Sequence, residues 1–357
     1  MTPRTTDEAL ERLLDEGAAR AAAIDPEEAR LWQAVAAAAE GGKRFRPALV
    51  TAAHGVLGGT DPAAAAEVGA AIELLHTALI IHDDVIDGDD VRRGRPNVSG
   101  TYTAHALAAG AAPGEAADLG HAAGILAGDL ALAAAVRAVA TCGAPTDVVR
   151  RLLDLVDAAL HTTAAGELAD VRLSLHLGSA SLAESLAMEE QKTSAYSFAL
   201  PLQAGAVLAG SDDGTVARLG EAGRLLGAAF QLVDDLLGVF GDPGRTGKSA
   251  TSDLRTRKQT PLLLHAASTP QWQEIGAYVG RDLTDDELDT ARRLLTASGS
   301  RAFVEELAAA QLAGARAVLD ELGIAGDLVP AVTACLPMLA GDDAADGRPA
   351  AEKEVAA

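Results

Sequence analysis

The sequence predicts an all-α protein, and three observations support this fold class. Alanine and leucine dominate the 357 residues, and runs of β-branched residues are short. Apolar residues recur at spacings of three and four, which is the period of one helix face. Hydrophobic residues make up 49% of the chain, enough for a sizeable core, so a disordered chain is excluded.

The first five predicted helices have recognisable starts and ends. Thr6 opens the first, and Asp25-Pro26 and Asp61-Pro62 open the second and the fourth, as proline at a first helical position should. Glycine pairs at 41–42 and 58–59 end the second and the third. These helices are predicted over residues 6–22, 26–40, 46–57, 62–86 and 118–140.

The other five helices follow the same rules. Ala144-Pro145, Ser181 and Asp213 begin three of them, and none of the breakers between helices is long enough for an interdomain linker. We therefore predict one all-α domain over residues 1–341, followed by a flexible acidic tail over 342–357. The helices are predicted over residues 145–176, 181–193, 213–240, 283–297 and 301–322.

Charge and cysteine content narrow the function classes. The chain has 29 Lys and Arg against 51 Asp and Glu, which gives a net charge of −22. This charge opposes binding to nucleic acid or anionic lipid, because both carry the same sign. Only Cys142 and Cys335 carry thiols, the N-terminus is charged, and no stretch has about twenty uncharged apolar residues. We therefore predict a cytoplasmic protein with no transmembrane segment and no nucleic-acid partner.

The first candidate site is an acidic motif at the end of an apolar helix. Asp83, Asp84 and Asp87 follow the apolar run 79–81, so they are predicted where a buried helix opens into a cavity. On a helical wheel His76, Asp83 and Asp87 share one face, and Asp84 lies at its edge. Carboxylates one turn apart bind hard cations through oxygen, which favours Mg²⁺ over zinc. A solvated helix end is the alternative for such a motif alone.

A second pair, Asp234 and Asp235, lies in a similar apolar helix. The helix dipole disfavours acids near a C-terminal end, so a bound cation explains this pair better than chance does. Two such helices facing each other would form a self-repelling cage unless metal ions neutralised it. Diphosphate is the natural ligand for several Mg²⁺ ions in such a cage.

Lysine is rare in this chain, and its positions are informative. Of the 29 basic residues only five are lysines, and compact ammonium groups bind phosphate oxygens as point charges. Arg46, Arg92 and Arg93 can bind the same oxygens bidentately. Outside the tail, the lysines lie in polar motifs beside Gly or Thr, namely Lys43, Lys192, Lys248 and Lys258.

Together these segments resemble the trans-type isoprenyl diphosphate synthases, also called polyprenyl synthetases. The motifs occur in the family's order between residues 41 and 264: Gly-Gly-Lys-Arg-x-Arg-Pro, Asp-Asp-x-x-Asp followed by Arg-Arg-Gly, Lys-Thr, Phe-Gln-x-x-Asp-Asp, Gly-Lys, Asp-Leu and Lys-x-Thr. The resemblance implies the isoprenoid synthase fold, a single bundle of long helices around a deep central cavity, and a homodimer. It also implies head-to-tail condensation of isopentenyl diphosphate with an allylic diphosphate (dimethylallyl, geranyl or farnesyl), which releases diphosphate.

The resemblance further implies a role for each matching residue. Up to three Mg²⁺ ions would be held by Asp83, Asp84, Asp87 and Asp234, with Asp235 beside them. The allylic diphosphate would be bound by Arg92, Lys192, Lys248 and Lys258, and the reacting centre would be lined by Thr193 and Gln231. The diphosphate of isopentenyl diphosphate would be bound by Lys43, Arg46, His76 and Arg93.

Product length in this family depends on residues about one turn before the first aspartate motif. Members that make the fifteen-carbon product usually have an aromatic residue there, whereas this chain has Ala78 and Leu79. The resemblance therefore implies a longer product, with geranylgeranyl diphosphate first. One departure is Gly238, which stands where the family usually has a third aspartate in the second motif. It predicts weaker binding of the third Mg²⁺.

Two alternatives remain. A terpene cyclase would share the metal-triggered ionisation but needs no second diphosphate site, so the intact Lys43, Arg46, His76 and Arg93 set argues against it. A non-catalytic subunit of a heteromeric synthase typically loses aspartates from one motif, and Gly238 is the only such loss.

Overall fold

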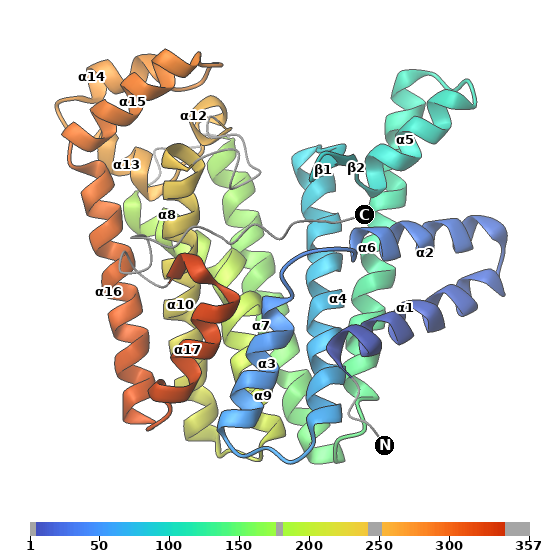
Figure 1. The fold of residues 1–357 in the computed structure, drawn as a ribbon. Coiled ribbons are helices and arrows are strands. Elements are labelled where there is room, and N and C mark those ends of the chain that lie inside the picture. The colour runs from blue at the N-terminus through green and yellow to red at the C-terminus, as the bar shows by residue number, and fades with distance from the viewer. Residues whose placement is uncertain (1–4, 176–180, 242–251, 340–357) are drawn as a thin grey trace, which may run out of the picture.

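The computed structural model describes residues 5–175, 181–241 and 252–339, and it consists almost entirely of helices (Figure 1). The predicted all-α class is therefore confirmed. In chain order the elements are α1 (Thr6–Ala22), α2 (Pro26–Ala38), α3 (Phe45–Val56), α4 (Pro62–Asp87), β1 (Val91–Arg92), β2 (Arg95–Pro96), α5 (Val98–Ala108), α6 (Pro113–Ala140), α7 (Thr146–Ser174), α8 (Leu182–Glu189), the π-helix η1 (Glu190–Ala199), α9 (Leu200–Leu208), α10 (Asp213–Phe240), α12 (Ser252–Thr256), α13 (Pro261–Ala267), α14 (Trp272–Ile275), the 3₁₀ helix η2 (Gly276–Tyr278), α15 (Asp285–Ala297), α16 (Ser300–Glu321), α17 (Ala325–Cys335) and the 3₁₀ helix η3 (Pro337–Leu339).

Capping chemistry sets the helix starts that the sequence predicts. Asp25 Oδ1 accepts hydrogen bonds from the backbone N–H groups of Glu27 and Glu28 at 2.7 and 2.9 Å. Asp61 Oδ1 accepts one from the N–H of Ala64 at 2.9 Å. These bonds satisfy donors that have no partner within the helix, so α2 and α4 begin at the predicted prolines.

Some elements differ from the sequence-based expectation. The long helix expected from residue 118 begins at Pro113, and the region 88–96, expected as a break, contains the short antiparallel hairpin β1–β2. Helix α8 ends at Glu189, where the expected helix 181–193 continues as a π-helix. The expected acidic tail, residues 342–357, lies outside the described residues.

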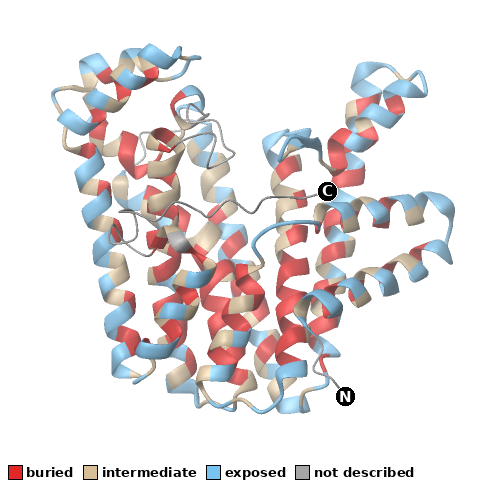
Figure 2. Cartoon of the chain, in the orientation of Figure 1, coloured by how far each residue is buried: buried red, intermediate tan, exposed pale blue. Residues whose placement is uncertain are grey.

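Two apolar clusters form the core. The larger one is built around α3, α4, α6, α9 and the first half of α10, and the smaller one joins the second half of α10 to α12, α13, α15 and α16. Figure 2 shows the buried residues concentrated on the long central helices, whereas α1, α2 and α15 show exposed outer faces. Helix α10 is therefore shared by both clusters.

Two helices, α4 and α6, are long and apolar enough by length and composition to span a membrane. In the folded chain 78% of the apolar window of α4 and 44% of that of α6 is buried. The core helices of soluble proteins meet the same criterion, so this is weak evidence for a membrane span.

Candidate active site

A cavity of about 1190 Å³ brings most of the predicted site residues together. Helices α4, α7, α10 and the π-helix η1 supply most of its wall, with Arg92 from the hairpin and Lys258 from the segment after α12. Its apolar lining includes Leu79, Ile80, Leu132 and Leu160. Its polar lining includes the predicted residues His76, Asp83, Asp87, Arg92, Lys192, Thr193, Gln231, Asp234 and Lys258.

The first aspartate motif divides its three carboxylates between two environments. Asp83 and Asp87 line the cavity, whereas Asp84 is 4% exposed and is not part of the lining. Arg92 donates from Nε to Asp84 Oδ1 at 2.6 Å and from Nη2 to Asp83 Oδ2 at 2.9 Å. Burial raises the pKa of Asp84 and of Asp87, and for Asp87 the Asp83 charge adds to the rise. Asp83 and Asp87 are thus the pair available to a ligand, and Asp84 fixes Arg92 beside them.

Lys192 lies among three carboxylates. Its Nζ is 3.0 Å from Asp83 Oδ1, 3.1 Å from Glu167 Oε2 and 2.7 Å from Asp170 Oδ2. Burial lowers the pKa of Lys192, but these carboxylates outweigh it and the net pKa is raised, so the ammonium stays charged. Sequence reasoning missed Glu167 and Asp170, although both line the cavity. Their spacing of three on a long helix was the available signal.

The second aspartate motif likewise has one carboxylate that lines the cavity and one that is buried beside it. Asp234 lines the cavity, and Asp235 is 2% exposed. Asp235 Oδ1 accepts a hydrogen bond from Gln231 Nε2 at 3.1 Å and lies 3.8 Å from Lys258 Nζ. Glu189, which sequence reasoning missed, is 5% exposed beside Asp235. Burial raises the pKa of Asp235 to about 6 and that of Glu189 well above its usual range, so this pair favours holding a proton.

Close backbone packing surrounds the π-helix that carries Lys192 and Thr193. A side chain at Gly166 of α7 would place its Cβ 2.2 Å from the backbone nitrogen of Lys192. A side chain at Gly227 of α10 would place its Cβ 2.4 Å from Ser194 Oγ. Glycine at both positions lets the two neighbouring helices approach the wider π-helix, and π-helical turns are frequent at functional sites.

The residues expected to bind the second diphosphate are only partly assembled. His76 lines the cavity, and its Nδ1 lies 3.1 Å from the hydroxyl of Tyr196, a lining residue that sequence reasoning missed. Burial lowers the pKa of His76 well below its usual value, and the charges of Arg46 and Arg93 lower it further. Arg46 is buried and donates to Ser197 Oγ at 2.9 and 3.1 Å.

Of the remaining predicted diphosphate-binding residues, Lys43 and Arg93 are not part of the cavity lining. Lys43 is exposed, and Arg93 donates to the backbone oxygen of Glu40 at 3.2 Å. Lys248 lies outside the described residues. Of the two predicted chain-length positions, Leu79 lines the cavity, whereas Ala78 is fully buried in the larger apolar cluster and is not part of the lining.

The donor set suits Mg²⁺ bound together with a diphosphate. Within the described ranges, no three His, Cys, Asp or Glu side chains come together as a ready-made metal site. Asp83 and Asp87 nevertheless present two carboxylates one turn apart to the cavity, and Asp234 presents a third. Mg²⁺ typically takes one or two protein carboxylates and completes its shell with phosphate oxygens and water. The carboxylates therefore fit a metal that arrives with its phosphate ligand.

Comparisons with known proteins agree with this geometry. The polyprenyl synthetase family model matches residues 28–295. The chain belongs to the polyprenyl synthetase family. It is 33% identical over 298 residues to the geranylfarnesyl diphosphate synthase of Aeropyrum pernix, and the aligned region covers 82% of this chain and 86% of that relative. It is also 33% identical over 301 residues to the geranylgeranyl diphosphate synthase of Mycobacterium tuberculosis. That aligned region covers 82% of this chain and 79% of the relative.

Solved structures lead to the same family. The geranylgeranyl pyrophosphate synthase of Corynebacterium glutamicum, complexed with isoprenyl diphosphate and magnesium, superposes with a TM-score of 0.82 at 29% identity. The match covers 92% of this chain and 96% of that chain. This polyprenyl synthetase therefore has the predicted isoprenoid synthase fold, and it is a prenyltransferase, as the motifs imply.

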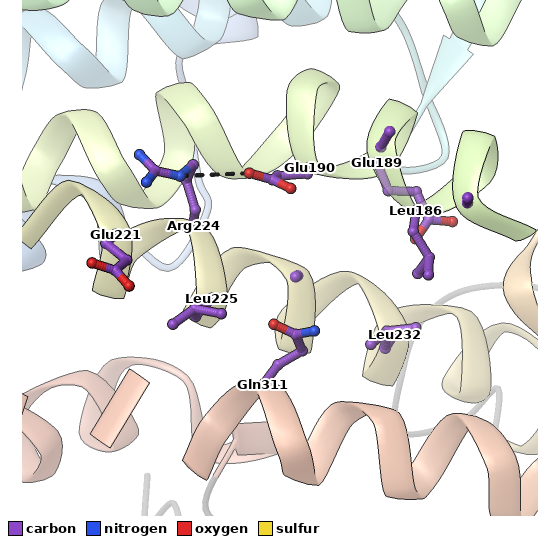
Figure 3. Close-up of a pocket in the computed structure, with 11 residues that line it drawn as sticks. Leu186, Glu189, Glu190, Glu221, Arg224, Leu225, Leu232 and Gln311 are labelled. Atoms are coloured by element: carbon purple, nitrogen blue, oxygen red, sulfur yellow. Dashed lines mark ion pairs between the residues drawn. The ribbon is translucent and has the colours of Figure 1, made fainter. Parts of the chain in front are cut away.

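A second, smaller cavity of about 370 Å³ lies between α8, α10 and α16 in this polyprenyl synthetase (Figure 3). Its lining includes Leu186, Leu225 and Leu232, and its Arg224 lies 3.5 Å from Glu190 in an ion pair. Arg224 is the one cationic side chain in the lining of this cavity, whereas the larger cavity presents three, Arg92, Lys192 and Lys258. A diphosphate therefore matches the larger cavity better.

Proposed function

We propose that the protein is a magnesium-dependent synthase that joins isopentenyl diphosphate head to tail to an allylic diphosphate. The observation that carries the proposal is the shared cavity of Asp83, Asp87 and Asp234, which continues along the apolar side chains Leu79 and Leu160. An allylic diphosphate has the same two parts, a multiply charged head and an apolar tail. The cavity matches this amphipathic shape and has room for a long tail.

In this proposal Asp83, Asp87 and Asp234 hold up to three Mg²⁺ ions on the allylic diphosphate. Magnesium supplies positive charge that stabilises the diphosphate as it leaves. Arg92, Lys192 and Lys258 bind the same diphosphate, and Lys192 is already held in the cavity by Asp170. Fixed positive groups of this kind cost no reorganisation when charge develops on the leaving oxygen.

The carbon that loses the diphosphate becomes positively charged and needs oxygen atoms nearby. Thr193 and Gln231 line the cavity and are suited to this role. Gln231 Nε2 donates a hydrogen bond to Asp235 Oδ1. The oxygen of the same amide, Oε1, is therefore the Gln231 atom that can stabilise the positive charge on this carbon. Asp235 therefore acts as a positioning residue for Gln231, and it also lies beside Lys258.

Isopentenyl diphosphate would bind on the side of the cavity that carries His76. Arg46, Arg93 and Lys43 would bind its diphosphate, and the neutral imidazole of His76 can share a hydrogen bond with it. Orientation of the two substrates in one cavity places the isopentenyl double bond against the cation. The released diphosphate then takes the final proton.

We propose a product of twenty or more carbons, with geranylgeranyl diphosphate first. Leu79 is the cavity-lining residue one turn before Asp83, and leucine leaves space that an aromatic ring would fill. The apolar lining continues to Leu132 and Leu160, so a tail can pass this level.

A product analysis tests the function. The purified chain is incubated with Mg²⁺, isopentenyl diphosphate and, separately, allylic diphosphates of five, ten and fifteen carbons, and products are identified by mass spectrometry. We expect prenyl diphosphates of at least twenty carbons. A hydrocarbon product would indicate a terpene cyclase instead, and no turnover, with restoration by a partner chain, would indicate a subunit of a heteromeric synthase.

We also propose a cytoplasmic homodimer. Both cysteines are free thiols, which supports a reducing compartment. Leu119, Ile125 and Leu126 of α6 are 43–55% exposed, and an apolar face of this kind indicates an interface. Light scattering should give twice the chain mass, and Leu126→Glu should shift it towards the monomer.

A further inference from the structure

The smaller cavity, between α8, α10 and α16, has the size of a small-molecule site. Its volume of about 370 Å³ lies within the usual range of ligand pockets, which begins at about 300 Å³. A water molecule takes about 30 Å³ of liquid, so the cavity has room for about a dozen non-hydrogen atoms. This is too few for the prenyl chain of twenty carbons that we assign to the larger cavity.

The lining of the smaller cavity joins an apolar wall to an acidic one. Its charged residues are three glutamates and Arg224. Two of the glutamates have cationic partners, because Glu190 lies 3.5 Å from Arg224 and Glu221 pairs with Arg218. The apolar wall consists of leucine and alanine side chains, namely Ala183, Leu186, Ala187, Leu225, Ala228 and Leu232 (Figure 3).

The third glutamate, Glu189, has an acceptor atom that is not satisfied by the described part of the chain. The residue is 5% exposed, and its Oε1 is shielded from solvent. Among the described residues, none donates a hydrogen bond to Oε1. Buried polar atoms nearly always have a hydrogen-bond partner, so a ligand that carries N–H groups can complete this carboxyl group.

Glu189 also connects the two cavities. Of the residues that the structure describes, it is the only one that lines both. It lies beside Asp235, whose Oδ1 accepts a hydrogen bond from Gln231 and is 3.8 Å from Lys258. Asp234 lines the larger cavity together with Glu189. A positive charge placed on Glu189 therefore opposes a metal ion at Asp234, because like charges repel.

We propose that the smaller cavity binds a small primary amine with an apolar body, whose ammonium group donates to the carboxyl group of Glu189. The leucine side chains contact the apolar body, and the acidic lining favours a cation over a neutral or anionic head group. Binding is coupled to the larger cavity through Glu189, and only this coupling rests on the proposed function. The amine and the metal-bound diphosphate then weaken each other by the same factor.

Three probes with the same eight-carbon chain test the head group: octylamine, 1-octanol and octanoate. Octylamine is charged at pH 7, as the alkylammonium group of lysine is. Calorimetry on the full-length chain, without Mg²⁺ or diphosphate, measures the three affinities. We expect octylamine to bind at least about tenfold more tightly than the other two. Equal binding of octylamine and 1-octanol would overturn the preference for an amine, and an absence of octylamine binding would overturn the site.

Variants locate the bound amine. Gln311 lines the smaller cavity from α16 and is not part of the larger cavity's lining, so Gln311→Trp should weaken octylamine binding at least about tenfold. Ala309→Trp, at an exposed position of the same helix, should not. Glu189→Gln should remove the preference for octylamine over 1-octanol, and Glu221→Gln, whose carboxylate already has Arg218, is its matched control. Unchanged octylamine binding in Gln311→Trp would contradict this location.

A titration distinguishes coupling from competition. The apparent Kd of octylamine is measured at saturating Mg²⁺ and increasing inorganic diphosphate. Two coupled sites raise this Kd to a plateau, which we expect at about fivefold, whereas one shared site raises it without limit. An unlimited rise would overturn the separate site, and an unchanged Kd would overturn the coupling. The binding measurements without Mg²⁺ do not depend on catalysis, so failure of prenyl transfer in its own assay would be recognised separately.

Discussion

Lys192 Nζ lies 3.0 Å from Asp83 Oδ1 and 2.7 Å from Asp170 Oδ2, so one ammonium group joins α4 to α7 across the cavity. The same carboxylate of Asp83 is bound by Arg92 at 2.9 Å. A cation that binds Asp83 must therefore compete with two positive side chains. A diphosphate resolves this competition, because its oxygens can accept Lys192 and Arg92 while Asp83 turns to the metal.

Replacing Lys192 by Met should reduce turnover strongly. The change removes a preorganised positive group from the leaving diphosphate, and losses of this kind are about 10² to 10³ in kcat. It also leaves Asp83, Glu167 and Asp170 without their shared cation, so Mg²⁺ meets less competition at Asp83 and the variant should need less Mg²⁺ for half-maximal rate. Steady-state kinetics at several Mg²⁺ concentrations measure both effects. Arg172→Met, at an exposed position of α7, the helix that carries Glu167 and Asp170, should change neither.

The buried His76 should make stability depend on pH. Its pKa in the fold is well below the usual value, so below about pH 6.5 the unfolded chain binds a proton that the folded chain does not. The free energy of unfolding should therefore be unaffected above this pH and should fall as the pH drops below it. His76→Gln should reduce this slope in urea titrations between about pH 7 and about pH 5. The exposed His105→Gln is the control, and an equal slope in both variants would contradict the assignment.

Two neighbouring substitutions should separate product length from stability. Leu79→Phe places an aromatic ring in the cavity wall and should shift the product towards fifteen carbons while the fold is kept. Ala78→Phe places the same ring in the fully buried core, where overpacking costs about 1–3 kcal/mol. Mass spectrometry of products and thermal melts distinguish the two. Shorter products from Ala78→Phe with an unchanged Tm would show that residue 78 faces the substrate.

Gly166→Ala should disturb the π-helix. The new methyl group would lie 2.2 Å from the backbone nitrogen of Lys192, so α7 and η1 must separate. We expect destabilisation of about 1–3 kcal/mol and a lower kcat, because Lys192 and Thr193 move with the backbone. Gly114→Ala, on α6 with open space around it, is the control and should leave Tm and kcat unchanged or slightly raise Tm. A full-activity Gly166→Ala enzyme would rule out this packing constraint.

Strong apolar periodicity and clear capping residues allow a helix to be predicted from the sequence. Helices that lack these signals were not predicted. The expected helices 6–22 and 213–240 agree with α1 and α10 at both ends. Helix α5 was not expected, because its first six residues, Val-Ser-Gly-Thr-Tyr-Thr, are all weak helix formers. The π-helix could not be predicted from its own residues, because the close packing around it depends on Gly166 and Gly227, which lie on other helices.

The same distinction applies to the site. The helical wheel places His76, Asp83 and Asp87 on one face, and all three line the cavity. Sequence reasoning missed Asp170 and Glu189, because an acid in a long helix looks the same whether it faces solvent or a buried lysine. Only the contacts with Lys192 and Asp235 separate these acids from the exposed ones on the same helices.

The sharing of α10 by two apolar clusters has a consequence for local unfolding. Asp83 and Asp87 belong to a helix anchored in the larger cluster, whereas Asp234 lies between Leu232 and Val239 of the smaller one. Regions with separate cores can open separately, and amide hydrogen exchange records each opening. We expect amides of α12, α13 and α15 to exchange sooner than those of α4 in the unliganded chain. Mg²⁺ and diphosphate bind both aspartate motifs at once, so they should make the two regions open together and slow exchange in both.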